Sequence, residues 1–118
     1  MIQKQRPVVF GDGEQTRDFT YIDNVVQANL LAATAPDAAG EFMNIGCGER
    51  ISLNEVLRTA FDLLGSTLDI DYREPRAGDV RDSLADIQKA ERLLGYRPTI
   101  KFKEGLNNTL AAIQTGIV

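Results

Sequence analysis

Histidine is absent from this chain of 118 residues, and cysteine occurs only once. Without histidine, the chain has neither a Ser-His-Asp or Cys-His nucleophile system nor a histidine-containing metal site. The single cysteine, Cys47, cannot form a disulfide within the chain or a cysteine cluster for zinc or iron–sulfur. Much hydrolase and metal chemistry is therefore excluded, and the low cysteine count leads us to expect a cytoplasmic protein.

Long apolar runs and an excess of positive charge are also missing. No run approaches the roughly 18 apolar residues of a membrane span, and the N-terminal stretch MIQKQRPVVF has no secretory-signal pattern. The net charge is −4 and the pI is about 4.8, whereas nucleic-acid and anionic-membrane binders need an excess of basic surface. We therefore expect a soluble protein without nucleic-acid or membrane partners.

The residues that are present describe an ordinary globular chain. With 43% apolar and 25% charged residues, the composition predicts a single domain over residues 1–118 with a modest core. Nine of the thirteen basic residues are arginine, whose planar guanidinium binds carboxylates and phosphates through two hydrogen bonds at once. This imbalance indicates anion recognition.

Hydrophobic periodicity predicts about four helices with short strands between them, an α/β or α+β arrangement. A Ser52/Glu55 capping box and a terminal Gly65 mark the clearest helix, and Thr20 with Asp23 resembles a second capping box. The other expected helices lie at 86–94, where Asp86 is the predicted cap, and at 104–115. The expected strands are 7–10, 41–45 and 67–73.

Two glycine pairs imitate the dinucleotide fingerprint G-x-G-x-x-G. The third glycine is replaced by Thr16 after Gly11-x-Gly13 and by Ile51 after Gly46-x-Gly48. A side chain at that third position obstructs the close helix-to-strand contact that the fingerprint requires. We interpret both pairs as structural turns.

The acid–base pair of short-chain dehydrogenases, Tyr-x-x-x-Lys, is not found in this sequence. Four residues after the three tyrosines stand Val25, Arg76 and Ile100. In that pair, the lysine lowers the pKa of the tyrosine so that the phenol acts near neutral pH. Without it, we expect no redox catalysis of this type by the chain alone.

Arg17 and Arg76 each lie in a predicted irregular segment near glycine. Two arginines from separate loops could clamp the two anionic groups of a diphosphate through charge-assisted hydrogen bonds. The alternative is that they form surface ion pairs with nearby carboxylates: Asp18 or Asp23 for Arg17, and Glu74 or Asp79 for Arg76. Spacing alone leaves both interpretations open.

A series of motifs, taken together, resembles one family. The stretch from Phe10 to Asp23 resembles the segment that opens the last third of NAD-dependent nucleotide-sugar epimerases and dehydratases. These are extended short-chain dehydrogenases of the UDP-glucose 4-epimerase type. The later motifs follow in the family's order: Asn44-Ile45-Gly46-x-Gly48, Arg76-x-Gly78-Asp79-Val80, Ala85-Asp86-Ile87, Leu94-Gly95-Tyr96-x-Pro98 and Glu104-Gly105-Leu106. One departure is Asn24, where family members more often carry an aspartate.

The resemblance implies a role for four residues of this chain. Arg17 and Arg76 would contact the diphosphate of a UDP- or dTDP-sugar, and Asp79 the ribose, while Asn44 is a weaker substrate candidate. The family's NAD-binding Rossmann region and its catalytic pair have no counterpart here. Residues 1–118 are therefore expected to be the C-terminal, nucleotide-sugar-binding part of an extended Rossmann-type enzyme. We expect no catalytic residue and no cofactor bound by this chain alone, although the full-length family uses NAD.

Two other functions are alternatives to nucleotide-sugar binding. The first is a non-catalytic module that associates with itself, because apolar helix faces and the expected strand 41–45 lack partners in this sequence. A homo-oligomer, or association with a separate Rossmann-containing chain, would cover them. The second is a hydrolase using Asp69 and Asp71, which is disfavoured because both fall on the expected exposed face of a strand.

Overall fold

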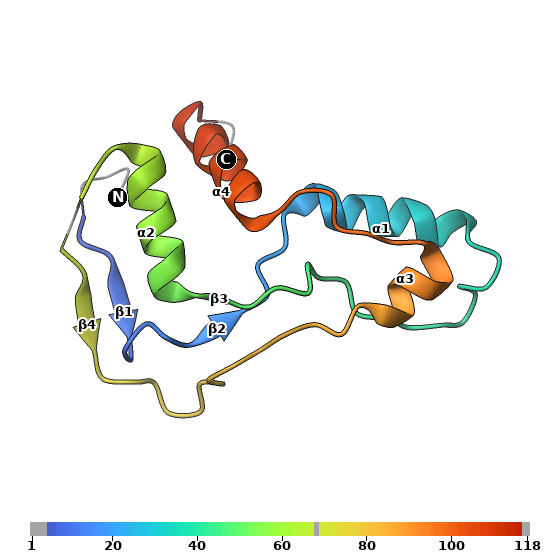
Figure 1. The fold of residues 1–118 in the computed structure, drawn as a ribbon, viewed down its shortest axis with the longest axis horizontal. Coiled ribbons are helices and arrows are strands. Elements are labelled where there is room, and N and C mark those ends of the chain that lie inside the picture. The colour runs from blue at the N-terminus through green and yellow to red at the C-terminus, as the bar shows by residue number, and fades with distance from the viewer. Residues whose placement is uncertain (1–4, 68, 117–118) are drawn as a thin grey trace.

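The computed structural model describes residues 5–67 and 69–116, in which four helices and four short strands are found (Figure 1). This agrees with the expected α/β class and with the expected number of helices. In chain order, the elements are β1 (Val8–Phe10), β2 (Thr16–Arg17), α1 (Ile22–Thr34), β3 (Ile51–Ser52), α2 (Leu53–Leu64), β4 (Asp71–Arg73), α3 (Gln88–Leu94) and α4 (Phe102–Gln114).

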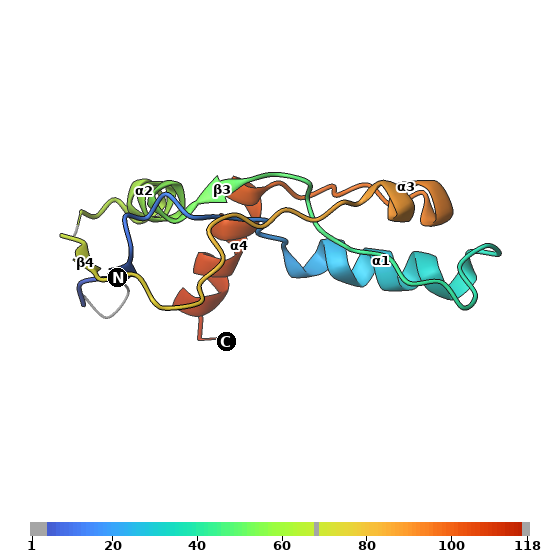
Figure 2. The same ribbon diagram turned by 90° about the horizontal axis from the view of Figure 1, so that it is seen from below.

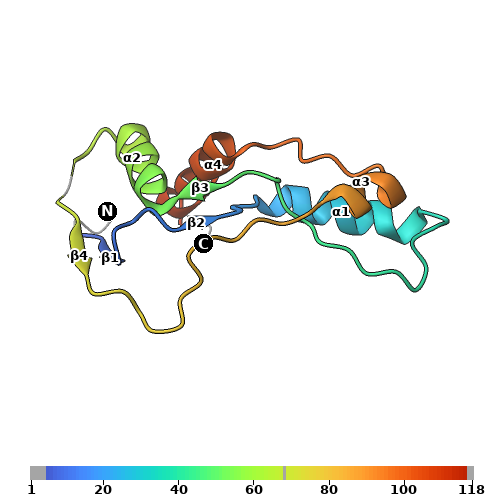
Figure 3. The same ribbon diagram turned by 60° about the horizontal axis from the view of Figure 1, so that its bottom comes forward.

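The molecule is elongated and flat, with extents of 50 × 36 × 18 Å. Its radius of gyration is 16.7 Å, compared with about 13.5 Å for a compact chain of this length. Helices α1 and α3 pack together at one end, whereas β1, β4 and α2 lie at the other (Figures 1 and 3). Helix α4 packs on α2, and Figure 2 shows how thin the molecule is when seen from below. The fold thus has two ends of different construction.

Two separate pairs of strands organise the β structure. Strands β1 and β4 are parallel, with Val9 opposite Tyr72, and the ladder continues where the Gly11 N–H donates to the Arg73 carbonyl at 2.8 Å. Strands β2 and β3 form a two-residue antiparallel pair, which the sequence patterns did not predict. Parallel pairing requires a long connection, and the chain between β1 and β4 contains both α1 and α2.

Two of the predicted strands differ from the structure. The predicted strand 41–45 is wrong: this segment is irregular, and Phe42 is 86% exposed. A strand needs a neighbour for its backbone hydrogen bonds, and the described part of the chain pairs none with this segment. The expected strand 67–73 is reduced to Asp71–Arg73, the residues that lie opposite β1. Leu68 lies outside the described residues.

The local signals of α2 are confirmed. The Ser52 hydroxyl accepts a hydrogen bond from the Glu55 N–H, and Gly65 ends the helix in the left-handed conformation with φ of 57°. These contacts satisfy backbone groups that a helix end otherwise leaves without partners. A capping box and a terminal glycine were sufficient to locate this helix.

The predicted starts of the other helices are less accurate. Thr20 is not the cap of α1, because its hydroxyl donates to Asp18 and the actual N-cap, Tyr21, makes no side-chain capping bond within the described chain. Helix α3 begins at Gln88 with Ile87 as its N-cap, one residue later than a cap at Asp86 predicts, although Asp86 does accept a hydrogen bond from the Gln88 N–H. Helix α4 begins earlier than predicted, at Phe102, whose ring packs on Phe19.

The buried core lies between α1 and α3. Ala28, Ala90, Leu94 and Tyr96 form one buried cluster, and the Tyr96 hydroxyl donates to the Gly46 carbonyl at 2.8 Å. Asn24 is also fully buried in α1. Its amide accepts from the Thr99 and Ile100 N–H groups and donates to the Ile100 carbonyl. This end of the molecule is therefore fixed by both apolar packing and satisfied polar contacts.

Candidate functional site

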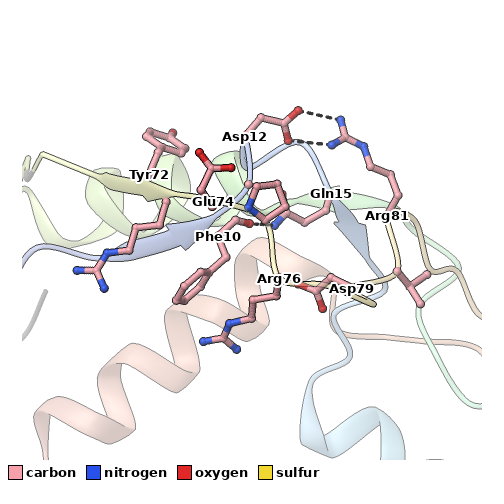
Figure 4. A pocket seen from close by; sticks show the side chains of 12 residues that line it. Phe10, Asp12, Gln15, Tyr72, Glu74, Arg76, Asp79 and Arg81 are labelled. Carbon is pink, nitrogen blue, oxygen red and sulfur yellow. Dashed lines mark hydrogen bonds and ion pairs between the residues drawn. The ribbon is translucent and has the colours of Figure 1, made fainter.

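A cavity of about 500 Å³ opens at the carboxyl ends of the parallel strands β1 and β4 (Figure 4). Phe10 ends β1 and lines it from one side, and the loop after β4, carrying Arg76 and Asp79, lines it from another. In α/β proteins, the carboxyl edge of parallel strands is a favoured position for ligands. The cavity is therefore the candidate functional site.

Three arginines line this cavity, and they differ in their partners. Arg73 forms an ion pair with Asp71, and Arg81 forms one with Asp12. Arg76 has no carboxylate within 4 Å in the described ranges; its guanidinium carbon lies 3.9 Å from the centroid of the Phe10 ring. A cation over an aromatic face is held in place without being neutralised. Arg76 is thus the positive group available to an anionic ligand.

Asp79 lies in the same loop as Arg76 and also lines the cavity. The Asp79 N–H donates to the Arg76 carbonyl at 3.2 Å, and Gly78 between them has a φ of 85°. A left-handed φ is readily adopted by glycine, so Gly78 permits this tight turn. The turn brings together two of the four predicted site residues, Arg76 and Asp79.

Arg17 is not among the residues that line this cavity. It lies in β2, and its guanidinium donates to the Thr16 carbonyl at 2.7 Å and to the Arg81 carbonyl at 3.3 Å. Arg17 therefore touches the far end of the loop that carries Arg76. Within the described chain, neither arginine pairs with a carboxylate, so the surface ion pairs considered for them are not formed.

Asn44 lies apart from the other predicted site residues. It lines a second hollow of about 590 Å³ with Asp18, Thr20 and Ser83. No lysine or arginine occurs among the described residues that line this hollow, so it offers no side-chain positive charge to a phosphate. The structure therefore does not bring Asn44 into the cavity of Arg76.

The turn Gly46-Cys47-Gly48 has an internal role. The Cys47 and Gly48 N–H groups donate to the two carboxylate oxygens of Asp18 at 2.8 and 2.9 Å. A Cβ atom on Gly46 would lie 2.5 Å from one of those oxygens. The backbone amides that would otherwise bind a phosphate thus bind Asp18. In the structure, the turn therefore serves an internal contact with Asp18.

Cys47 adds no reactive thiolate to the candidate site. Its thiol is buried, and burial together with the nearby Asp18 carboxylate raises its pKa above the ordinary value of 9.0. A thiol must ionise to act as a nucleophile or metal ligand. Among the described residues, no group of three His, Cys, Asp or Glu side chains could hold a metal ion.

Sequence reasoning missed the contacts that shape the cavity. The sequence patterns predict Phe10 only as the end of a strand, and they assign no role to Arg81. Arg81 donates from both terminal nitrogens to the two carboxylate oxygens of Asp12, each at 3.0 Å. Asp12 holds this arginine across 69 positions of sequence, so no local spacing could reveal the pair.

In the ranges that the structure describes, no helix is both long enough and apolar enough to cross a membrane.

Comparison with known sequences gave consistent matches. A sequence model described as GDP-mannose 4,6 dehydratase matches residues 1–109. The chain is 36% identical over 111 residues to the UDP-glucuronate 4-epimerase of Thermodesulfobacterium geofontis, covering 92% of this chain and 34% of that protein. It is 33% identical over 102 residues to the UDP-glucose 4-epimerase of Mycolicibacterium smegmatis, covering 86% and 32%. The chain thus spans about a third of the length of these relatives.

Solved structures give the same result at the level of the fold. The UDP-glucose 4-epimerase of Thermotoga maritima with UDP-glucose superposes with a TM-score of 0.92 and 36% identity, over 100% of this chain and 38% of that one. The UDP-glucuronic acid 4-epimerase of Bacillus cereus with UDP-glucuronic acid and NAD superposes with a TM-score of 0.90 and 31% identity, over 97% and 37%. The fold described above is therefore that of the C-terminal part of these enzymes.

Proposed function

Because this chain belongs to the nucleotide-sugar epimerases and dehydratases of the extended short-chain dehydrogenase family, we propose that its cavity binds the nucleoside diphosphate of a UDP- or dTDP-sugar. The observation that carries the proposal is Arg76, an arginine without a carboxylate partner in the described chain, at the carboxyl ends of β1 and β4. The relatives bearing UDP-glucose and UDP-glucuronic acid support the same class of ligand.

The proposed roles follow the positions of the residues. Arg76 contacts the diphosphate, and Asp79, one turn away in the same loop, accepts a hydrogen bond from a ribose hydroxyl. Arg17 supplies a second positive charge from β2, next to the end of that loop. Asn44 remains the weakest candidate, since it lines a different hollow.

We propose that the chain alone is catalytically silent and binds no NAD. Hydride transfer in this family depends on a nicotinamide cofactor, and the Gly46-Cys47-Gly48 amides that resemble a cofactor loop bind Asp18 instead. Residues 1–118 contain no tyrosine–lysine pair, so catalysis would need a Rossmann region that supplies this pair and the cofactor site, for example from a separate Rossmann-containing chain. The buried thiol of Cys47 is compatible with the proposed cytoplasmic location.

Calorimetric titration with UDP, UDP-glucose and dTDP-glucose tests the proposed ligand. We expect micromolar binding, and we expect Arg76→Ala and Arg17→Ala each to weaken it by about 1.5–3 kcal/mol, the scale for hydrogen bonds to charged groups. Arg92→Ala, which removes an exposed arginine from α3, is the matched control and should bind as the wild type does. Unchanged affinity in both site variants would show that neither arginine contacts the ligand.

A second candidate function, self-association, is favoured by α1. Ile22, Val26 and Leu30 lie at four-residue spacing and are 61%, 48% and 68% exposed. Asp23 is the single charged residue in this 13-residue helix. An apolar stripe along one side of a helix is normally packed against another element. We propose that a second copy of the chain covers this stripe, pairing in antiparallel fashion so that Val26 meets its equivalent.

The molecular surface is consistent with such a partner. The chain exposes 7875 Å², whereas a folded monomer of 13.0 kDa exposes about 6,300 Å². Light scattering should therefore return a dimer that Val26→Glu dissociates and that Ile113→Glu, a matched charge on α4, does not. The strand 41–45, which we had expected to pair between copies, does not contribute because it is irregular. A monomer at high concentration would contradict this second function.

A further inference from the structure

The loop that carries Arg76 and Asp79 has almost no burial to hold it in place. Every residue from 72 to 84 is exposed, and the loop extends away from the body of the molecule (Figures 1 and 3). Apolar packing therefore does not fix it, and its position depends on a small number of polar contacts. These contacts decide how the candidate cavity is shaped.

One end of the loop is fixed by backbone pairing, where the Gly11 N–H donates to the Arg73 carbonyl. The other end is held against the 12–17 segment. There the Thr16 N–H donates to the Arg81 carbonyl at 3.0 Å, and the Ser83 N–H donates to the Thr16 carbonyl at 3.1 Å. Two side-chain contacts add to these bonds: the Thr16 hydroxyl donates to Asp82 at 2.7 Å, and Arg81 forms a two-bond pair with Asp12 (Figure 4).

Asp12 is also held in place by contacts other than its pair with Arg81. Its carboxylate accepts a hydrogen bond from the Glu14 N–H at 2.9 Å, and its carbonyl accepts one from the Asn54 side chain at 3.0 Å. The carboxylate is thus a fixed point on the β1–β2 turn. An arginine that donates two parallel hydrogen bonds to one carboxylate fixes the relative orientation of the two side chains as well as stabilising the contact.

We infer that Asp12 and Arg81 are positioning residues for the nucleotide site. Their pair holds the 74–81 loop in place so that Arg76 and Asp79 face the cavity. The Arg81 carbonyl also accepts from the Arg17 guanidinium. Arg81 therefore also sets the position of Arg17 relative to Arg76. The inference rests on the proposed function, because it concerns how that ligand is held.

The pair should affect binding without affecting the stability of the whole chain. Its side chains are 62% and 55% exposed, and exposed pairs contribute little to global unfolding. Losing it leaves this end of the loop held by its contacts with Thr16 and Arg17. A cost of about 1 kcal/mol in ordering the loop corresponds to roughly five-fold weaker binding. The effect is therefore expected on affinity and on loop exchange.

The test compares wild-type chain, Asp12→Asn, Arg81→Ala and the double variant. Asparagine still accepts from the Glu14 N–H, so Asp12→Asn removes the charge and preserves the turn. Glu49→Gln is the matched control, because it breaks an exposed ion pair, with Lys101, in which neither residue lines the cavity. UDP-glucose affinity is measured by calorimetry, and backbone hydrogen exchange of residues 74–83 is measured without ligand.

We expect each single variant to bind about five-fold more weakly, the double variant to bind no more weakly than the singles, and exchange to rise in all three. The control should match the wild type, and melting temperatures should stay equal. If the wild-type chain binds UDP-glucose and both single variants keep its affinity and its hydrogen exchange, the positioning role is wrong. The proposed function is not affected by that result. If the wild-type chain binds no nucleotide, the proposed function fails, and the positioning role fails with it.

Discussion

The two ends of the molecule are held together in different ways. Around α1 and α3, buried residues such as Ala28 and Tyr96 pack closely, and Asn24 satisfies several backbone groups from inside the core. Around β1 and β4, the candidate site relies on exposed contacts, such as the Asp12–Arg81 pair and Arg76 over Phe10. Because the two ends are held by different contacts, the stability of the chain and its ligand binding can be changed separately. Changes at the first end should unfold the chain, and changes at the second should alter affinity.

The largest effect is expected at Tyr96. Tyr96→Ala removes a fully buried aromatic side chain and should lower the free energy of unfolding by about 3–5 kcal/mol. Tyr96→Phe keeps the ring and removes only the hydroxyl that donates to Gly46, so it should cost less, about 1–3 kcal/mol. Urea denaturation measures both. Equal losses in the two variants would show that the hydroxyl, and not the ring, is what matters.

Asn24→Ala should have the next largest effect. It leaves the Thr99 N–H, the Ile100 N–H and the Ile100 carbonyl without their side-chain partner. Each buried polar group that loses its partner costs roughly 1–3 kcal/mol, so we expect a loss of at least about 2 kcal/mol. Asn29→Ala is the control on the same helix, since within the described residues its exposed amide donates to the Val25 carbonyl and to no other group. Denaturation curves that overlap for the two variants would contradict the role of Asn24.

The smallest effect concerns the titration of Asp12. Hydrogen bonding to Arg81, followed by that to the Glu14 N–H, holds the pKa of Asp12 below its ordinary value of 3.8. Because the folded pKa is the lower one, the pair is fully formed above pH 3.8 and is lost as the pH falls through the folded value. Carboxyl NMR should show this depressed pKa in the wild type. In Arg81→Ala, the pKa should rise towards the ordinary value, and an unchanged pKa would rule out the pair in solution.

The sequence predicted the parts of the fold that local chemistry determines. Ser52, Glu55 and Gly65 lie within one helix length, so their capping contacts could be predicted without knowing any distant partner. The segment 41–45 had the composition of a strand, but a strand forms only beside another strand, and the sequence does not show which segments become neighbours. The error there lies in tertiary pairing and not in propensity.

The candidate site was predictable to a similar extent. Arg76 was predicted from its irregular segment near glycine, and Asp79 from the family resemblance. The structure places both at the cavity. The Asp12–Arg81 pair joins distant segments and has no sequence signature. Asn24 shows the same limit: the pattern assigned it to a helix, whereas its burial against Ile100 depends on how α1 meets a distant loop.

A ¹H–¹⁵N NMR titration of the chain with UDP-glucose shows directly whether the cavity beside β1 and β4 binds a nucleotide sugar. The proposed site predicts saturable shifts at the amides of Gly11, Asp79 and Arg81, which line the cavity. The amides of Ala28 and Ala90, in the core between α1 and α3, should not move. Shifts centred on that core, or no shifts at millimolar ligand, would contradict the claim that the cavity beside β1 and β4 binds a nucleotide sugar.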